Sequence, residues 1–312
     1  MITIVIVNWN ANQQLAECVV SIAQYHHNLV ASVVIVDNAS SDNSLALVKS
    51  LPTLPFPLFV VENKENRGFA AACNQGAARA VSEYLLFLNP DTRLFESSLT
   101  VSTAFMEESK NQEVGIVGIQ LIDDQNQVAR SCARFPSLGM FVAQILGINR
   151  LPGFWYLNVH MSGWAHDKTA AVDHVMGAFY LMRRSLFESL GGFDERFFVY
   201  LEDLDLSLRV QQAGYHSVFL AEAKAFHAGG GTSGQVKAAR LFYSLRSRLL
   251  YAFKHFSPWR AWILVLITLG VEPVTRTFFS IVSGELMGVD NTWRAYSMLW
   301  RNMRFILEKS RQ

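Results

Sequence analysis

Residues 2–10 read ITIVIVNWN, and this stretch decides the fold because an unbroken apolar run ends there in a polar cluster. The same pattern recurs along the first ninety residues. The apolar runs are Ile2 to Val7, Ser32 to Val36, Leu58 to Val61 and Tyr84 to Leu88. Val, Ile, Leu and Phe without alternation are typical of parallel strands covered on both faces. The stretches between the runs, residues 13–25, 43–50 and 69–81, suit crossover helices. The sequence therefore predicts an α/β fold with a mostly parallel sheet flanked by helices.

A polar cluster follows each of these runs. The clusters begin at Asn8, Asp37, Glu62 and Asn89. In open α/β sheets, ligands bind outside the carboxyl ends of the strands. Residues as distant in sequence as Asn8 and Asp91 are therefore expected on one rim of the sheet.

Composition limits the possible function. The chain has 312 residues, of which 51% are hydrophobic, so it is long enough to form a full globular core. A formal net charge of +1 does not favour a nucleic-acid partner, which would call for a basic surface. The three cysteines are far apart, which argues against a disulfide framework or a zinc cluster and favours a reducing cytoplasm. The N-terminus has no basic segment or cleavage site and reads as a core strand rather than a signal peptide.

A change of composition divides the chain near residue 235. Residues 1–235 are expected to form the catalytic domain and residues 236–312 a C-terminal helical extension, where arginines alternate with apolar residues. Residues 136–169 are irregular and aromatic, which predicts a long loop or lid. The longest apolar run, Ala261 to Val271, is expected to stop at Glu272 and Pro273. It would then cover only about half of the roughly 20 residues that span a bilayer.

Several acidic residues and one histidine are candidates for chemistry. Asp91 ends the fourth run and suits a hard divalent ion, or else caps the next helix. In YLEDLDL, residues 200–206, helical spacing puts Glu202 and Asp205 on one face and Asp203 about 100° away. One carboxylate could face a reacting hydroxyl, or the group could be an acidic helix start with Asp205 paired to Arg209. His227 precedes a glycine run and could complete a metal shell or be structural.

Two further segments suit nucleotide binding. Asp37 could accept hydrogen bonds from a ribose or base, or form an Asx turn with its polar neighbours. Residues 63–69, NKENRGF, include Asn66 and Gly68, and would let the backbone approach a phosphate at a helix start. The motif G-x-G-x-x-G is absent after the first run, which counts against a dinucleotide-binding dehydrogenase.

Six stretches taken together resemble the family 2 glycosyltransferases with the GT-A fold, in particular their rhamnosyltransferase-like branch. In order they are IVIVNWN, VVIVDNASSDNS, ENRGFAAACNQG, LFLNPDT, residues 176–215 and AFHAGGGTS. They span roughly residues 2–250. The resemblance implies a GT-A, Rossmann-like sheet with the nucleotide-sugar donor on residues 1–120 and the acceptor on residues 121–235.

The resemblance also implies a role for each matched position. Asp203 matches the general base of inverting members, and Asp91 and His227 match contacts of a Mg²⁺ or Mn²⁺ ion. Asn89 stands where the first acid of the D-x-D motif would be. The remaining matches are on the donor side, Asn8, Asn10, Asp37, Asn66, Gly68, Asn74 and Asn89, and on the acceptor side, Gly177, Ala178, Glu202 and Asp205.

The implied reaction is metal-dependent transfer of a sugar, L-rhamnose in this branch, from a dTDP- or UDP-sugar to a glycan or polyprenyl-diphosphate-linked acceptor. The branch acts in cell-surface polysaccharide synthesis. This predicts a cytoplasmic protein with peripheral membrane contact through Arg240, Arg246, Arg248, Lys254 and Arg260 and through Trp259, Trp262, Ile263 and Leu264. The alternative for this region is packing on the catalytic domain or an oligomer contact. The alternatives are another hexose from a UDP- or GDP-sugar, a nucleotidyltransferase and a non-catalytic relative.

Overall fold

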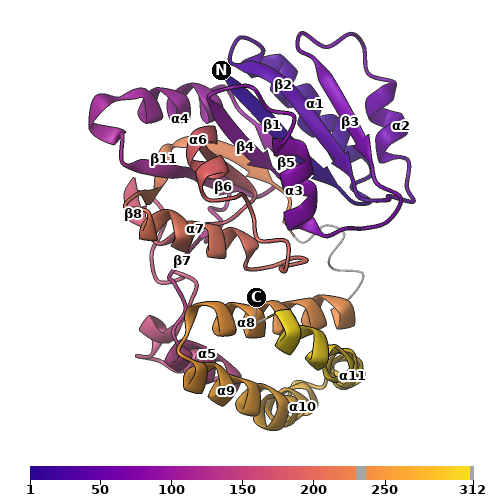
Figure 1. Cartoon of the computed structure of the whole chain (residues 1–312), viewed down its shortest axis with the longest axis vertical. Coiled ribbons are helices and arrows are strands. Elements are labelled where there is room, and N and C mark those ends of the chain that lie inside the picture. The colour runs from indigo at the N-terminus through magenta and orange to yellow at the C-terminus, as the bar shows by residue number, and fades with distance from the viewer. Residues whose placement is uncertain (230–236, 310–312) are drawn as a thin grey trace.

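A computed structural model describes residues 1–229 and 237–309 (Figure 1). A mixed sheet runs through its upper part in the order β3-β2-β1-β4-β10-β6-β11-β5, with β8 on β11. The strands are β1 (Ile2–Asn8), β2 (Val30–Asp37), β3 (Leu58–Glu62), β4 (Tyr84–Leu88), β5 (Thr92–Leu94), β6 (Val114–Ile122), β8 (Ala170–Val172), β10 (Phe179–Arg183) and β11 (His216–His227). The first four strands are parallel to one another, as predicted. β10 runs antiparallel to β4 and β6.

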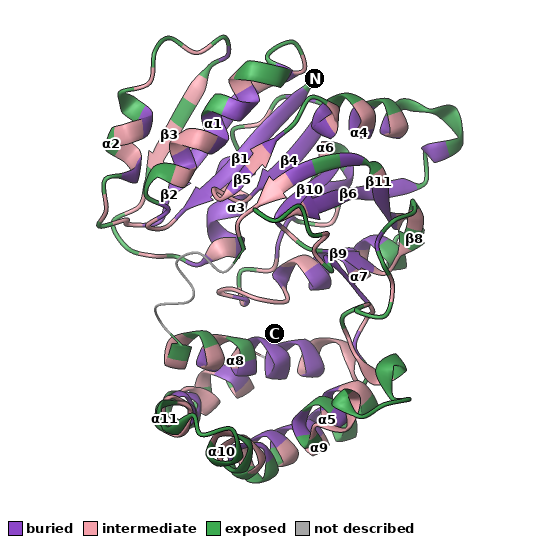
Figure 2. Cartoon of the chain, turned by 180° about the vertical axis from the view of Figure 1, so that it is seen from behind, coloured by how far each residue is buried: buried purple, intermediate pink, exposed green. Residues whose placement is uncertain are grey.

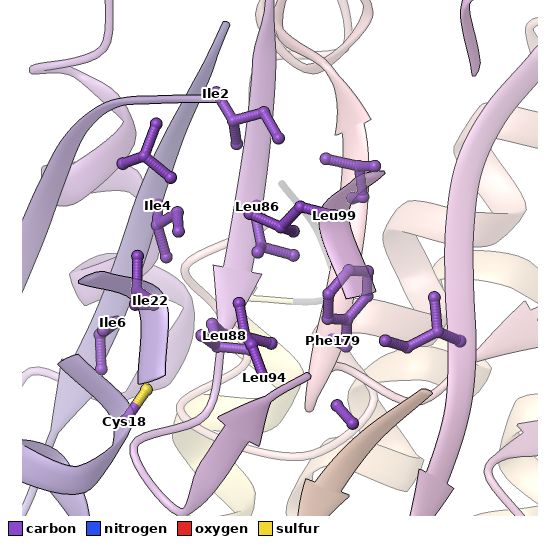
Figure 3. Packing of buried hydrophobic residues seen from close by; sticks show 14 of the residues in the cluster. Ile2, Ile4, Ile6, Cys18, Ile22, Leu86, Leu88, Leu94, Leu99 and Phe179 are labelled. Carbon is purple, nitrogen blue, oxygen red and sulfur yellow. The ribbon is translucent and has the colours of Figure 1, made fainter. Parts of the chain in front are cut away.

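Helices cover the sheet on both faces, which explains the unbroken apolar runs. Ile2, Ile4 and Ile6 of β1 pack on one face (Figure 3). Val5 and Val7 pack on the other. The first face carries α1 (Gln13–His26), α2 (Ser44–Lys49) and α4 (Ser97–Glu107). The second face carries α3 (Phe69–Ala77), α6 (Arg184–Ser189) and α7 (Glu202–Gln212). The predicted α/β layers are therefore confirmed.

The strand register brings the predicted rim residues together. Asn8 of β1 lies opposite Asp37 of β2, which lies opposite Glu62 of β3. His227, at the end of β11, lies opposite Thr92 of β5, directly after Asp91. The last four residues of the motif AFHAGGGTS, and the division near residue 235, lie outside the described residues.

A helical module forms the lower part of the molecule (Figures 1 and 2). It consists of α5 (Leu138–Leu146), α8 (Lys237–His255), α9 (Pro258–Leu266), a π-helical turn (Ile267–Val271), α10 (Glu272–Val282) and α11 (Leu286–Lys309). One hydrophobic cluster joins α5, α8, α9 and α11 and also takes in Phe197 and Leu204 from the part of the chain that carries the sheet. The division into residues 1–235 and 236–312 stays a prediction, and α5 joins the C-terminal helices from the middle of the chain.

The prediction of a lid over residues 136–169 is wrong for its first part. Residues 138–146 form α5, because Ser137 caps the helix by accepting a hydrogen bond from the Met140 amide at 3.2 Å, and Gly147 ends it in the left-handed conformation. The rest of the stretch contains the short 3-10 turns Ile148–Arg150 and Trp155–Leu157. A two-stranded sheet of β7 (Cys132–Ala133) and β9 (His174–Val175) flanks it.

The predicted stop at Glu272 and Pro273 is also wrong. The helix continues from Pro258 to Val282, and among the described residues it is the one helix long and apolar enough to cross a membrane. The π-helical turn precedes Pro273, where it accommodates a residue that lacks an amide donor and crowds the preceding turn. Glu272 does not interrupt the helix because its buried carboxylate pairs with Arg248 and Arg276.

Candidate active site

Asp91 and His227 meet at the rim of the sheet. The Asp91 Oδ1 atom lies 3.3 Å from His227 Nε2, and both side chains are mostly buried. Asn89 Nδ2 lies 3.4 Å from the same nitrogen. Asp91 caps no helix, since α4 begins only at Ser97. The pairing of β5 with β11 therefore joins two residues that lie far apart in the sequence.

This pair fits a divalent ion whose other ligands come from the substrate. It offers one carboxylate and one imidazole, and the described residues contain no group of three or more metal-binding side chains. Mg²⁺ is commonly held by one or two carboxylates together with substrate phosphates and water, and imidazole is a good ligand for transition metals. Asp91 and His227 are therefore the residues suited to hold an ion against a diphosphate.

Asp203 lies at the first turn of α7 and is held in place by backbone amides. The Gly177 amide donates to Oδ2 at 2.9 Å, and the Leu204 amide donates to Oδ1 at 2.8 Å. A Cβ atom on Gly177 would lie 3.0 Å from Oδ2, so the glycine permits this close approach. The Asp203 side chain remains 17% exposed, so its carboxylate could contact a substrate.

A short hydrogen-bonded path joins Asp203 to the Asp91 turn. Gly177 holds Asp203, and the carbonyl of the next residue, buried Ala178, accepts from the Asn89 amide at 3.0 Å. Ala178 also accepts from the Thr92 hydroxyl at 3.4 Å. Gly177 and Ala178 therefore connect the Asp203 carboxylate to the turn that carries Asp91.

The three acids of the E-D-L-D stretch face different surroundings. Glu202 is buried, and burial, with a smaller effect of Asp203, raises its pKa well above the usual range. Its Oε2 atom has no hydrogen-bond partner. Asp205 is fully buried and faces the helical module, away from Asp203, so its predicted place beside the acceptor is not what the contacts show.

Asp205 instead links α7 to α8. It accepts from Arg209 Nε at 2.9 Å, as the alternative interpretation of the sequence proposed, and lies 2.7 Å from both Lys254 Nζ and His255 Nε2. Burial alone would raise the pKa of Asp205, but the hydrogen bond from His255 and the charges of Arg209 and Lys254 hold it below its usual value. Lys254 also pairs with Asp194 at 2.7 Å.

Asn8, Asn10 and Asp37 form one hydrogen-bonded rim. Asn8 is fully buried and donates to Asp37 Oδ1 at 2.7 Å and to the Ser44 hydroxyl at 2.8 Å. Asp37 Oδ2 accepts from the Ser40 amide at 3.0 Å, three residues on, so the bond closes a local turn one residue wider than an Asx turn. Asn10 has a positive φ of 54° and accepts from the Ser41 amide. Asn8 thus orients Asp37 from below the surface.

Asn66, Gly68 and Asn74 serve contacts within the chain. Asn66 accepts from the Gly68 amide at 2.9 Å. Gly68 has φ 86°, and a Cβ atom there would lie 2.4 Å from the carbonyl oxygen of Phe198. Asn74 bonds both the amide and the carbonyl of Phe193, each at 2.9 Å. The predicted phosphate loop is therefore locked to the segment that precedes α7.

The sequence did not single out three other residues of this region. Asn38 is buried and donates to the Gly68 carbonyl at 3.0 Å, so it holds the loop; its place beside Asp37 was the available signal. His174 Nε2 lies 3.6 Å from Asp203 Oδ2, and burial lowers its pKa. Phe198 stacks on Tyr243 of α8 with ring centroids 4.5 Å apart. No local pattern marks His174 or Phe198.

Comparison with known proteins identifies the class to which this fold and site belong. The family model described as glycosyl transferase family 2 matches residues 3–191, so the chain belongs to that family and is a glycosyltransferase. The chain is 28% identical over 250 residues to an N-acetylglucosaminyl-diphospho-decaprenol L-rhamnosyltransferase of Mycobacterium tuberculosis, covering 74% of this chain and 77% of that protein. It is 33% identical over 150 residues to the rhamnosyltransferase WbbL of Escherichia coli, covering 48% of this chain and 52% of that protein.

A solved structure supports the fold. The mannosyltransferase of Pyrobaculum calidifontis, in complex with GDP-Man and Mn²⁺, aligns with a TM-score of 0.56 at 18% identity, covering 99% of this chain and 85% of that one. At this identity the likeness concerns the fold alone. The expected GT-A architecture, with its helical extension, is confirmed.

Proposed function

We propose that this chain is an inverting, metal-dependent transferase that moves L-rhamnose from dTDP-rhamnose to a polyprenyl-diphosphate-linked glycan in cell-surface polysaccharide synthesis. The observation that carries the proposal is the path from Asp203 through Gly177 and Ala178 to Asn89, beside the Asp91–His227 pair. These contacts support the proposal because a base for a hydroxyl and a site for a diphosphate would then lie on hydrogen-bonded neighbouring segments. The rhamnosyl and polyprenyl parts rest on the Mycobacterium tuberculosis and Escherichia coli relatives.

Asp203 is the residue suited to take the acceptor's proton. An acceptor hydroxyl is a poor nucleophile and must lose its proton as it attacks the anomeric carbon. The amides of Gly177 and Leu204 occupy one position on each carboxylate oxygen and fix the orientation of the group. Burial raises the pKa of the neighbouring Glu202, which favours its neutral form and so lessens the negative charge beside the base. Attack opposite the leaving group inverts the anomeric centre in one displacement.

Asp91 and His227 would hold the ion. When bound, a divalent ion would neutralise the charge that develops on the leaving nucleoside diphosphate. The buried Asn8 keeps Asp37 at the rim, where its carboxylate would accept hydrogen bonds from the nucleoside. The reaction would take place on the cytoplasmic side of the membrane that carries the acceptor.

A donor panel tests this proposal. The purified protein is incubated with dTDP-rhamnose, UDP-sugars and GDP-sugars, with Mg²⁺ or Mn²⁺ and a polyprenyl-diphosphate-linked N-acetylglucosamine. Formation of rhamnosylated lipid together with free dTDP, and an inverted anomeric configuration in the product, are the expected results. Turnover of another donor alone would refute the rhamnosyl assignment. A parallel reaction contains a nucleoside triphosphate and a sugar 1-phosphate in place of the donor. Release of pyrophosphate there would show a nucleotidyltransferase, and no turnover in either reaction would point to a non-catalytic relative.

A further inference from the structure

The long helix of the helical module is apolar on two sides. Its inner side packs within the module through buried Ala261, Leu264 and Val265, with Thr268 and Glu272 continuing the same side. Its outer side exposes seven apolar residues by 47% to 69%: Trp259, Trp262, Leu266, Val274, Phe278, Ile281 and Val282. Within α9 and within α10, most of these residues follow one another at three or four positions, which places them on one side of each helix. A patch of this extent on a folded chain marks a binding surface.

The apolar surface continues into the next helix. Leu286 and Met287, the first residues of α11, are 73% and 79% exposed, and Trp293 and Trp300 of the same helix are 44% and 48% exposed. Figures 1 and 2 both place α9 and α10 on the far side of α8 from the sheet. We name the exposed apolar residues of these helices the outer face. Tryptophan is the side chain enriched where a protein meets the membrane–water boundary.

The charge of the chain is divided between its two parts. Residues 237–312 contain 12 Lys and Arg and 4 Asp and Glu, a net charge of +8. Residues 1–236 contain 15 Lys and Arg and 22 Asp and Glu, a net charge of −7. The near-neutral total conceals this division. A positively charged module with an exposed apolar face is complementary to an anionic lipid surface, where each basic residue contributes about 1 kcal/mol.

The residues predicted from the sequence to touch lipid are only partly available. Arg248 and Leu264 are buried, Lys254 pairs with Asp194 and Asp205, and Arg246 lies over the Phe305 ring at 4.4 Å. Trp259, Trp262 and Arg260 are exposed, and so is Arg301 of α11. The lipid contact therefore has a different composition from the one the sequence indicated, with α10 and α11 supplying most of it.

Buried polar contacts hold the long helix within the module. Arg248 of α8 donates to the Glu272 carboxylate and, at 3.0 Å, to Thr268, and Arg276 Nε donates to Glu272 at 2.9 Å. The Thr275 hydroxyl donates to the Ile145 carbonyl of α5 at 2.9 Å. Burial alone would raise the pKa of Glu272, but Arg248 and Arg276 outweigh it and hold it below its usual value. A spanning orientation would leave buried charges unpaired, which is strongly destabilising.

We propose that the outer face lies flat in the cytoplasmic leaflet of an anionic membrane and anchors the chain at the membrane surface. The helix from Pro258 to Val282 is long enough to span the bilayer but lies along its surface instead. The inference deepens the proposed function, because a polyprenyl acceptor resides in a bilayer. Binding to lipid does not depend on sugar transfer, so the two can be measured separately. The module then holds α7 through Asp205, which keeps Asp203 at a fixed position relative to the membrane surface.

Vesicle co-sedimentation of the full-length protein tests the proposal. The expected result is binding to vesicles of phosphatidylcholine with phosphatidylglycerol, and at least tenfold weaker binding to phosphatidylcholine alone. The variant Trp262→Ser, Leu266→Ser, Phe278→Ser removes exposed side chains only and should weaken binding at least tenfold. Its matched control, Phe59→Ser with Val81→Ser, removes exposed apolar residues of the catalytic part and should bind like the wild type. Circular dichroism verifies that both variants are folded.

Three results of these experiments would overturn the proposal. Vesicle-bound protein that resists alkaline carbonate extraction would show a spanning helix. Equal binding by the triple variant and the wild type would exclude the outer face. A wild-type dimer that the triple variant converts to a monomer, with vesicle binding unchanged, would assign this face to a second copy of the chain. Sugar transfer by the triple variant is also measured with a water-soluble, short-chain acceptor. Because this acceptor needs no membrane, transfer to it tests the proposed function separately from membrane binding.

Discussion

The Asp205 link between α7 and α8 gives a prediction whose size follows from its contacts. Asp205→Asn keeps the shape of the side chain but removes a fully buried charge from Arg209, Lys254 and His255. Breaking a buried ion pair costs about 3–5 kcal/mol. The lower end applies here, because Arg209 also donates to the carbonyls of Leu190 and Gly192, and Lys254 keeps Asp194. A loss of about 3 kcal/mol corresponds to roughly 150-fold in the unfolding equilibrium.

Urea unfolding followed by tryptophan fluorescence measures this loss. The matched control is Asp290→Asn, which breaks the exposed pair with Arg294 in α11 and should change the free energy of unfolding by less than about 0.5 kcal/mol. The pKa of Asp205 is lowered, so its contribution is fully present above about pH 4 and is lost as pH falls through its lower folded pKa. Equal losses in the two variants at neutral pH would refute the reasoning.

The other predictions concern the active site. Asp203→Asn cannot accept a proton and should lower kcat at least ~100-fold with little change in donor affinity; near-normal kcat would move the base to another residue. Asp91→Ala should abolish donor turnover, and full activity of the wild type in excess chelator, with no metal retained, would remove the metal from the proposal. Glu202→Gln removes a buried acid whose pKa is raised by burial, so only the wild type loses stability as pH rises above the pKa of the unfolded chain. The free energy of unfolding of the variant relative to that of the wild type should therefore increase above about pH 4.5 by up to ~1.4 kcal/mol per pH unit. Free energies from urea unfolding that change equally with pH in both proteins would contradict this. Gly68→Ala places a Cβ atom against Phe198 at a positive φ and should lower the thermal midpoint, whereas Gly153→Ala, with nothing within 4 Å, controls for backbone strain alone.

Local patterns were sufficient to predict the layers of the fold and much of the rim. Five of the six residues of the run Ile2 to Val7 are apolar because alternate residues pack under helices on both faces, and such a run can be recognised in one sequence. The rule that ligands gather at strand ends then brings Asn8, Asp37 and Asp91 to one edge. His227 was found through the family resemblance, and the β5–β11 pairing explains its position beside Asp91.

Long-range partners account for what the sequence did not predict. An asparagine at position 74 does not reveal that its amide bonds Phe193, 119 positions along the chain. Glu272 looks like the end of an apolar helix until Arg248 is known to lie beside it. Asp205 shares a helix face with Glu202, but only the position of α8 decides which charge it meets. The partners of these three side chains depend on which surfaces pack together, and local patterns in a single sequence do not predict that packing.

The origin of the helical module from two separate stretches has a consequence for its synthesis. α5 ends at Leu146, and its partner α9 begins only at Pro258. At 5–20 residues per second, a ribosome needs about 6–22 seconds to make the intervening stretch. During that interval Phe141 and Ile145 have no α9 to bury them. The nascent chain therefore carries an uncovered apolar helix while its catalytic part is already emerging, and this helix is a natural binding site for a chaperone that acts during translation.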